Sequence, residues 1–361
     1  MPGVNVQKIV DALERSRGKV ALLADGFVDE VWQIVGSRAS VQDFTLYTRM
    51  SQYANRILSS GTGGVGMELV RKRRTFGGFV ANTGCAVARL GIDTTLVGLF
   101  GKENLDPVFS DVGNLCRLIS IDDPAVTHIF EFDDGKVMMS YVESLHNVNW
   151  KFLSDSLGAE RLLSLMADSD IIGVGYWSVL PAFDEIVAQI CDNLPRGDKP
   201  RRFFFDFADF RKNDPVSLAH TLCSLKALNE RVPMTLSVNE HEAVVLFETH
   251  NQTPDDIGRP IGEKTEDIRR EIGLDELVIH TPHYAVAAAA KEEPAFAATV
   301  FCENPVRVAG AGDTFNGGYV AASLAGLNLV ERLYVANAAV GCYLRTAASP
   351  DAKGLAKYID V

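Results

Sequence analysis

Short apolar runs alternate with amphipathic stretches along most of the chain, which is the pattern of a parallel β-sheet covered by helices. The runs are rich in Val, Ile, Leu and Phe, as expected for strands that are buried on both faces. The predicted strands are residues 19–25, 94–100, 170–176, 202–207, 234–238 and 276–281, and examples of the helical patterns are residues 181–194 and 215–230. The expected fold is α/β, with a doubly wound, mostly parallel sheet flanked by helices.

Two regions break this rhythm. Residues 30–75 are rich in Thr, Tyr, Arg and Gly, and residues 126–141 alternate around Asp134-Gly135, a hairpin signal. Together, approximately 30–75 and 125–142 predict a small β lid inserted within a single domain that spans 1–361. A second hairpin is predicted from AVAAAA (285–290) and ATVFCE (298–303), closed by KEEPAF (291–296).

Bulk properties narrow the class of protein. The formal charge of -12 argues against nucleic acid as the main partner, because phosphate contacts need many Lys and Arg. Residues 1–18 predict a polar-faced helix without a signal-peptide apolar run, and no apolar stretch is long enough for a membrane span. The expected location is cytoplasmic. Buried reduced thiols are expected at Cys85, Cys116, Cys191, Cys223, Cys302 and Cys342.

The segment VRVAGAGDTFNGGYVAASLAG (306–326) carries the most chemical information. Gly310, Ala311 and Gly312 have almost no side-chain bulk and precede a helical pattern, so a phosphate could approach their backbone N–H groups at a helix start. Phosphoryl transfer needs fixed donors of this kind, and Asp313 could accept the proton of an attacking hydroxyl. The alternative is that Asp313 only caps the helix.

Three further segments hold candidate ligands. Gly77 and Gly78 open a helical run that contains Asn82, which suits either a ligand close to the backbone or a tight loop before a core helix. The first strand ends near Asp25 and Asp29, whose carboxylates could bind hydroxyls or belong to a solvated turn. The pattern Asn239 to Glu242 predicts a capping box at a helix start.

GAGDTFNGG (310–318) resembles the C-terminal signature of the ribokinase (PfkB) family, and Gly77-Gly78 with Asn82 resembles its N-terminal signature, about 230 residues earlier. The resemblance implies an ATP-dependent phosphotransferase that moves the γ-phosphoryl group of MgATP to a hydroxyl of a small sugar-like substrate. It makes Asp313 the base and the N–H groups of residues 311–313 an anion hole. Asp29, Gly77, Gly78 and Asn82 would contact the substrate, with Asp25 in reserve for Asp29.

The same resemblance implies the remaining ligands and partners. Asn239 and Glu242 would order Mg²⁺ through water, and Thr281 and Asn337 would lie beside the nucleotide. The lid would close on substrate and could mediate a homodimer. Arg307 stands where relatives carry an Asp that helps to bind a monovalent cation, so its guanidinium could replace the charge of that ion.

Other functions stay open at this point. A nucleoside kinase of the same fold would suit the aromatic residues of segment 32–74, and a non-catalytic ligand-binding relative is a second alternative. An NAD-dependent oxidoreductase is more remote, because GTGGVG (61–66) follows a helical pattern instead of a strand. The run Arg71 to Arg74 is interpreted as a solvated face or, alternatively, as a clasp for a phosphate on the substrate. His280 and His283 lack a third zinc ligand.

Overall fold

The computed structural model describes residues 4–195, 201–250 and 259–359, and within them its main body is built around a nine-stranded sheet. The strands pair in parallel from β6 to β12, whereas β13 pairs antiparallel with β12 and with β14. In spatial order they are β14 (Glu292–Ala298), β13 (Tyr284–Ala289), β12 (Glu276–His280), β11 (Met234–Asn239), β10 (Arg202–Asp206), β9 (Ile171–Val174), β1 (Lys19–Leu23), β5 (Asp93–Leu99) and β6 (Arg117–Asp122).

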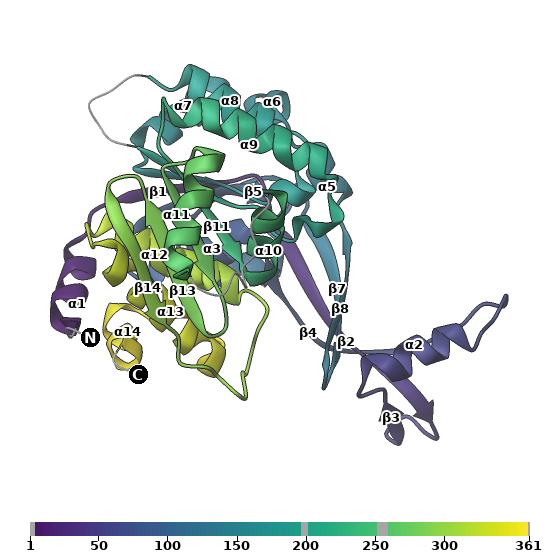
Figure 1. The fold of residues 1–361 in the computed structure, drawn as a ribbon. Coiled ribbons are helices and arrows are strands. Elements are labelled where there is room, and N and C mark those ends of the chain that lie inside the picture. The colour runs from purple at the N-terminus through teal and green to yellow at the C-terminus, as the bar shows by residue number, and fades with distance from the viewer. Residues whose placement is uncertain (1–3, 196–200, 251–258, 360–361) are drawn as a thin grey trace.

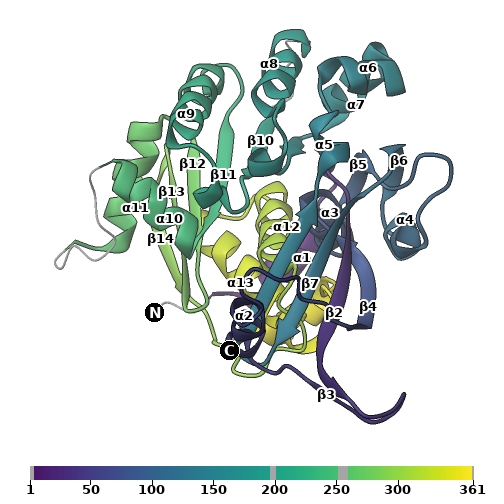
Figure 2. The same ribbon diagram turned by 90° about the vertical axis from the view of Figure 1, so that its right-hand side faces the viewer.

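Helices cover both faces of this sheet (Figures 1 and 2), which confirms the expected fold class. Each face has its own apolar core, because the buried strand side chains alternate between the two sides. One core is covered by α6 (Trp150–Leu157), α7 (Ala159–Asp168), α8 (Phe183–Asn193), α9 (Pro215–Asn229), α10 (Glu240–Thr249) and α11 (Ile261–Ile272). The other is covered by α1 (Val6–Arg15), α3 (Phe79–Arg89), α4 (Ser110–Gly113), α12 (Ala311–Leu324), α13 (Leu329–Thr346) and α14 (Ala352–Ile359).

The six strands predicted from apolar runs are present, with small differences at their ends. The hairpin near the C-terminus is also present, but the prediction that residues 291–296 close it and that 298–303 form its second strand is wrong. The second strand, β14, begins at Glu292, so the turn lies at Ala290 and Lys291. β14 is the edge strand of the sheet and exposes Glu292 and Glu293. Charged side chains are common on edge strands, where they discourage pairing with another chain.

A smaller sheet leaves one end of the body (Figure 1). Its central strand β2 pairs in parallel with β7 and antiparallel with β3 and β4, and β8 pairs antiparallel with β7. Its elements are β2 (Phe27–Arg38), β3 (Phe44–Leu46), α2 (Met50–Leu58), β4 (Leu69–Gly77), β7 (Ala125–Phe132) and β8 (Gly135–Tyr141), and α5 (Glu143–His146) follows. We call β2, β3, β4, β7 and β8 the small sheet. Its far end, with α2 and β3, projects away from the body.

The remaining expectations concern the termini and the thiols. The helix predicted over residues 1–18 is α1, and residues 1–3 lie outside the described part of the chain. All six cysteines are free; four are buried, whereas Cys223 is exposed and Cys302 is half-buried, so burial was over-predicted for these two. Within the described residues, no helix is both long and apolar enough to cross a membrane.

Candidate active site

The start of α12 presents unpaired backbone amides beside a buried carboxylate. Gly310 is the N-cap and has φ +86°, a conformation that favours glycine, and a Cβ at this position would lie 2.9 Å from the Tyr343 hydroxyl. The N–H of Ala311 donates to the Val308 carbonyl at 3.1 Å. Among the described residues, no acceptor is recorded for the N–H groups of Gly312 and Asp313. This helix start can therefore receive an anion.

Asp313 lies on the first turn of α12 with only 6% of its surface exposed. Its Oδ1 accepts a hydrogen bond from the Tyr176 hydroxyl at 2.6 Å, and its Oδ2 accepts one from Asn82 Nδ2 at 3.0 Å. Burial and the negative charge of Asp206 raise the pKa of Asp313 to about 7, although the hydrogen bonds from Tyr176 and Asn82 oppose the rise. A carboxylate with a pKa near neutrality is well matched to general-base catalysis.

Asp206 is a second buried carboxylate, at the carboxyl end of β10. It accepts hydrogen bonds from Asn316 Nδ2 at 2.7 Å and from the Ala208 N–H at 2.8 Å. Burial raises the pKa of Asp206, and its charge in turn raises the pKa of Asp313 and of Glu242. The carboxylates of Asp206, Asp313 and Glu242 therefore repel one another when they are ionised. This repulsion favours the binding of cations or of hydrogen-bond donors between them.

Asp29 comes from the small sheet and approaches the helix that carries Asn82. It is 8% exposed, and the Cβ that an alanine would add at Gly77 would lie 2.6 Å from its Oδ1. Gly77 is thus the residue that leaves room for this carboxylate. Burial raises the pKa of Asp29 to about 6, and the positive charges of Arg307, Lys136 and Arg73 oppose the rise.

Asp25, the reserve candidate for substrate binding, has a structural role instead. It is fully buried and accepts hydrogen bonds from the N–H groups of Phe79 and Val80, both at 2.9 Å. Gly78 is the N-cap of α3 with φ +88°, so Asp25 replaces a capping side chain that glycine lacks. Its carboxylate is occupied by the first turn of α3, which leaves Asp29 as the better placed acid.

Asp29 belongs to a row of oxygen-bearing side chains across the small sheet. In the strand register it is opposite Thr75 on β4 and Thr127 on β7, and Thr127 is opposite Ser140 on β8. Residues that are directly opposite share one face of a sheet. The Thr127 and Ser140 hydroxyls are 3.0 Å apart. This row offers hydroxyl and carboxylate partners for a polyhydroxy ligand.

The basic run of residues 71–74 is largely neutralised by acids. Lys72 and Arg73 share Glu131, at 3.0 Å and 2.5 Å. Arg74 pairs with Asp106 through two hydrogen bonds of 2.7 Å and 2.8 Å. Arg71 is 4.0 Å from Glu30 and lies over Trp32. These pairings weaken the hypothesis of a phosphate clasp.

Arg307 lies above the Tyr343 ring, with its Cζ 5.6 Å from the ring centroid, and its Nη2 is 3.4 Å from the Phe76 carbonyl. Its Nε is buried without a partner among the described residues. Because the charge of Arg307 lowers the pKa of Asp29, this guanidinium acts on the small-sheet side of the site.

A cavity of about 530 Å³ opens on the other side of the α12 start. Ala311 and Gly312 line it, as do three of the expected nucleotide ligands, Asn239, Thr281 and Asn337. Much of the remaining wall is apolar: Pro282, Val300, Phe301, Pro305, Val308, Phe315, Val340 and Leu344. Apolar walls around a few polar groups are typical of sites for small organic ligands.

Two of these polar groups have local structural roles. The Thr281 Oγ1 donates to the Tyr284 carbonyl at 3.0 Å, so it closes the turn between β12 and β13. Asn337 Nδ2 lies 3.3 Å from the Ala298 carbonyl. His280 lines the same cavity and packs on Phe315 at 4.7 Å between ring centroids, and burial lowers its pKa to about 4, so it is neutral.

Asn239 and Glu242 form the predicted capping box at the start of α10. Glu242 accepts from the N–H and from the Nδ2 of Asn239, at 2.9 Å and 2.7 Å, and it is 2% exposed. Burial and the charge of Asp206 raise its pKa. Within the described residues no group of three or more His, Cys, Asp or Glu side chains could hold a metal ion. A Mg²⁺ ion here would therefore depend on phosphate oxygens and water, with Glu242 as an outer partner.

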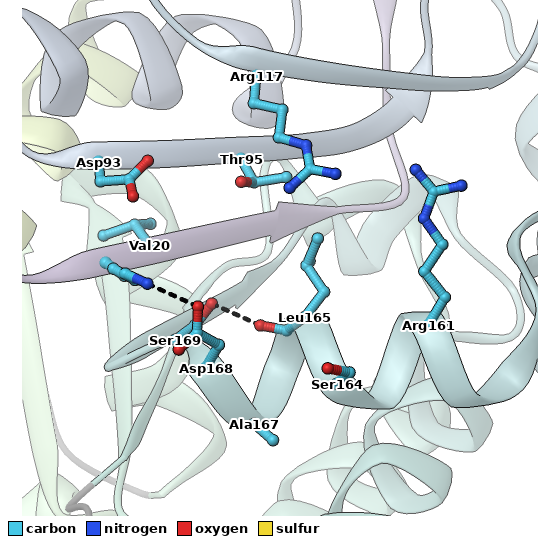
Figure 3. Close-up of a pocket in the computed structure, with 11 residues that line it drawn as sticks. Val20, Asp93, Thr95, Arg117, Arg161, Ser164, Leu165, Ala167, Asp168 and Ser169 are labelled. Atoms are coloured by element: carbon cyan, nitrogen blue, oxygen red, sulfur yellow. Dashed lines mark hydrogen bonds and ion pairs between the residues drawn. The ribbon is translucent and has the colours of Figure 1, made fainter.

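A different cavity, of about 800 Å³, lies at the amino ends of β1 and β5 (Figure 3). Lys19, Asp93 and Arg117 line it, and Lys19 pairs with Asp168 at 2.7 Å. None of the candidate site residues borders it. Ligands of open α/β sheets bind at the carboxyl ends of the strands, so this cavity is at the wrong end for the chemistry.

Sequence reasoning missed Tyr176 and Asp206. Both lie at the ends of predicted strands: Tyr176 is the last residue of 170–176 and follows β9, and Asp206 lies within 202–207 and ends β10. The signal that could have identified them is their position, because the carboxyl ends of adjacent parallel strands meet at one edge. β9 and β10 are neighbours in the sheet, and the apolar pattern alone does not reveal that order.

Comparison with known proteins supports a particular family. A family model described as prokaryotic ketohexokinase matches residues 6–361. The chain is 27% identical over 340 residues to a ketohexokinase of Haloferax volcanii, a match that covers 92% of this chain and 88% of that protein.

Solved structures agree on the fold. A ribokinase of Arabidopsis thaliana complexed with ribose and ATP superposes with a TM-score of 0.65 at 15% identity, covering 96% of this chain and 99% of that chain. An Escherichia coli protein described as a ribokinase II, in complex with ATP and Mg²⁺, gives a TM-score of 0.61 at 14% identity, covering 95% and 99%. At these identities the likeness establishes the fold alone.

Proposed function

The chain belongs to the prokaryotic ketohexokinase family, and on this premise we propose that it transfers the γ-phosphoryl group of MgATP to a hydroxyl group of a ketohexose, with Asp313 as the base. Its resemblance to the ribokinase (PfkB) family is confirmed, and the protein is an ATP-dependent sugar kinase. The observation that carries the proposal is the first turn of α12, where unpaired amides and the buried Asp313 carboxylate stand side by side.

In the proposed reaction the acceptor sugar lies between the small sheet and α12. Asp29 accepts hydrogen bonds from two hydroxyls of the sugar, as an ionised carboxylate can, and Thr127 and Ser140 extend the same row. Gly77 leaves room for the Asp29 carboxylate and Gly78 begins α3, and Asn82 orients both the base and the sugar. Closure of the small sheet over the sugar would exclude water and limit ATP hydrolysis.

The nucleotide lies in the cavity lined by Asn239, Thr281 and Asn337, with its base against the apolar wall. Its phosphates reach the N–H groups of Gly312 and Asp313, and Ala311 joins them when its bond to Val308 is released. Glu242 would hold a Mg²⁺ ion through water, and that ion would supply positive charge to the phosphates.

In the chemical step one bond to phosphorus forms while another breaks, and one proton moves to the base. The acceptor oxygen forms a bond to the γ-phosphorus while the bond from that phosphorus to the β,γ-bridging oxygen breaks, and ADP leaves. Asp313 takes the hydroxyl proton, and the fixed amides stabilise charge that develops on the transferred group.

Two alternatives are less well supported. A dinucleotide fingerprint needs a strand before it and a helix after it, whereas residues 61–66 lie between α2 and β4, in the reverse order. A nucleoside kinase would use the aromatic residues of segment 32–74. Of these, Tyr53 already stacks on Phe132 within the small-sheet region, with ring centroids 5.8 Å apart. Dimerisation through the small sheet stays a prediction.

The test is ADP release with fructose, tagatose, glucose, ribose and adenosine as acceptors, with Asp313→Asn as the inactive control. We expect the largest kcat/KM with a ketohexose, and phosphorus NMR of the product identifies the hydroxyl that is modified. A preference for adenosine would favour the nucleoside kinase. Nucleotide binding without turnover of any acceptor would favour a non-catalytic binding protein.

A further inference from the structure

Both oxygens of the Asp313 carboxylate are already engaged, and the two donors differ in kind. Asn82 donates through an amide nitrogen, which has no acceptor capacity. Tyr176 donates through a hydroxyl, which can donate and accept. The Tyr176 ring is held against Phe79, with ring centroids 6.0 Å apart, so its hydroxyl has a fixed place.

This difference matters when the base takes up a proton. While Asp313 is ionised, it accepts from both neighbours and keeps free lone pairs for the hydroxyl of a substrate. Once protonated, it has an O–H that needs an acceptor. The Tyr176 oxygen can become that acceptor by rotation of its own hydroxyl hydrogen, whereas the Asn82 nitrogen cannot.

We propose that Tyr176 is a positioning residue for the base: its hydroxyl donates a hydrogen bond to the ionised Asp313 carboxylate before the reaction and accepts a hydrogen bond from the protonated Asp313 carboxyl group afterwards. The inference rests on the proposed function of Asp313 as the base. No sequence motif singled out Tyr176, and the contact arises because the carboxyl end of β9 faces the start of α12.

The charged surroundings fix the sign of the expected effects. Asp206 from β10, Asp25 from the end of β1 and Asp29 from β2 are the acids that interact electrostatically with Asp313 or Tyr176. Tyr343 from α13 also interacts with Asp313, and Arg307 faces Tyr343 and Asp29. Burial and the negative charges of Asp313, Asp206 and Asp25 raise the pKa of the Tyr176 hydroxyl well above its ordinary value, so it remains protonated and able to donate.

The test compares the acidic limb of the pH profile of kcat/KM for the best sugar acceptor in three proteins. Tyr176→Phe keeps the ring but removes the donor to the ionised carboxylate, so we expect the limb to move to higher pH by roughly one unit. Replacement of Tyr176 by 3-fluorotyrosine makes the hydroxyl a stronger donor, so the limb should move to lower pH. Tyr53→Phe, on α2 with its ring stacked on Phe132, is the matched control and should leave the limb unchanged.

Opposite shifts in the two Tyr176 variants support the inference, because a purely structural change would lower activity without moving the limb in two directions. An unchanged limb in both variants would overturn it. If the wild type phosphorylates no sugar, the proposed function fails. The hydrogen bond between Tyr176 and Asp313 is then tested by the pH dependence of protein stability. Unfolding free energy measured between pH 5 and pH 9 should fall further in Tyr176→Phe than in the wild type, and identical profiles would refute the contact itself.

Discussion

Replacement of Asp313 by Asn should stabilise this protein at neutral and alkaline pH while it abolishes activity. The buried carboxylate has a pKa raised from the ordinary 3.8 to about 7. The folded state therefore binds the proton more tightly than the unfolded state does. Stability is retained below pH 3.8 and is lost progressively as the pH rises to about 7, because the unfolded chain ionises freely in that range.

The size of the effect follows from the same values. Each whole unit of pKa corresponds to about 1.4 kcal/mol, so a rise from 3.8 to about 7 costs the folded state about 4 kcal/mol above neutrality. Asn has nearly the same shape and can satisfy both neighbours. Its carbonyl can accept from Asn82, and its amide can donate to the Tyr176 hydroxyl, which also accepts.

The measurement is urea-induced unfolding of the wild type and of Asp313→Asn at pH 5 and at pH 8. We expect the gain in unfolding free energy to be about 1.6 kcal/mol at pH 5, where the unfolded chain is already ionised, and about 4 kcal/mol at pH 8, together with a loss of kcat of about 10²–10⁴-fold. Asp133→Asn, at an exposed turn, is the matched control and should change neither quantity. An equal gain at both pH values, or none at pH 8, would refute the argument that Asp313 is a strained buried anion.

Three further changes address the ligands. Gly77→Ala places a Cβ 2.6 Å from Asp29 Oδ1, so it should raise the KM for sugar by roughly tenfold or more and leave the KM for ATP unchanged. The control Gly113→Ala, whose Cβ would lie 3.5 Å from its nearest neighbour, should change neither KM, and an unaltered sugar KM in Gly77→Ala would exclude Asp29 from substrate binding. Glu242→Gln should raise the Mg²⁺ concentration needed for half-maximal rate, and an unchanged Mg²⁺ titration would remove Glu242 from the metal site. Phe301→Ala should raise the KM for ATP several-fold because it removes part of the apolar wall of the nucleotide cavity. Phe296→Ala, outside that cavity, is the control, and an equal rise of the KM for ATP in both variants would contradict the proposed nucleotide site.

The apolar runs sufficed to predict six of the nine strands of the main sheet, because strands buried on both faces have a distinctive composition. The spacing of Gly310 to Asp313 likewise predicted a helix start with bare amides, since small residues and a following helical pattern leave few other conformations. Both inferences depend on neighbours in the chain.

Contacts between distant segments are the part that could not be predicted. Tyr176 and Asp313 are 137 residues apart in sequence, and their hydrogen bond depends on the strand order and on how α12 packs against the sheet. The family resemblance favoured Asp29 over Asp25, although the residues alone do not distinguish these two acids near a strand end. The choice between them depends on which carboxylate is occupied by the first turn of α3, a feature of packing alone.

In the proposed reaction, one turn of α12 carries both the amides that bind the phosphates and the carboxylate that takes the proton of the acceptor. Because the amides and the carboxylate belong to the same helical turn, a displacement of α12 changes neither the distance between them nor their relative orientation. Asp29 and its hydroxyl-bearing neighbours sit on a separate structural unit, the small sheet. Selection for a new sugar can therefore remodel those strands while the machinery for phosphate transfer is inherited intact.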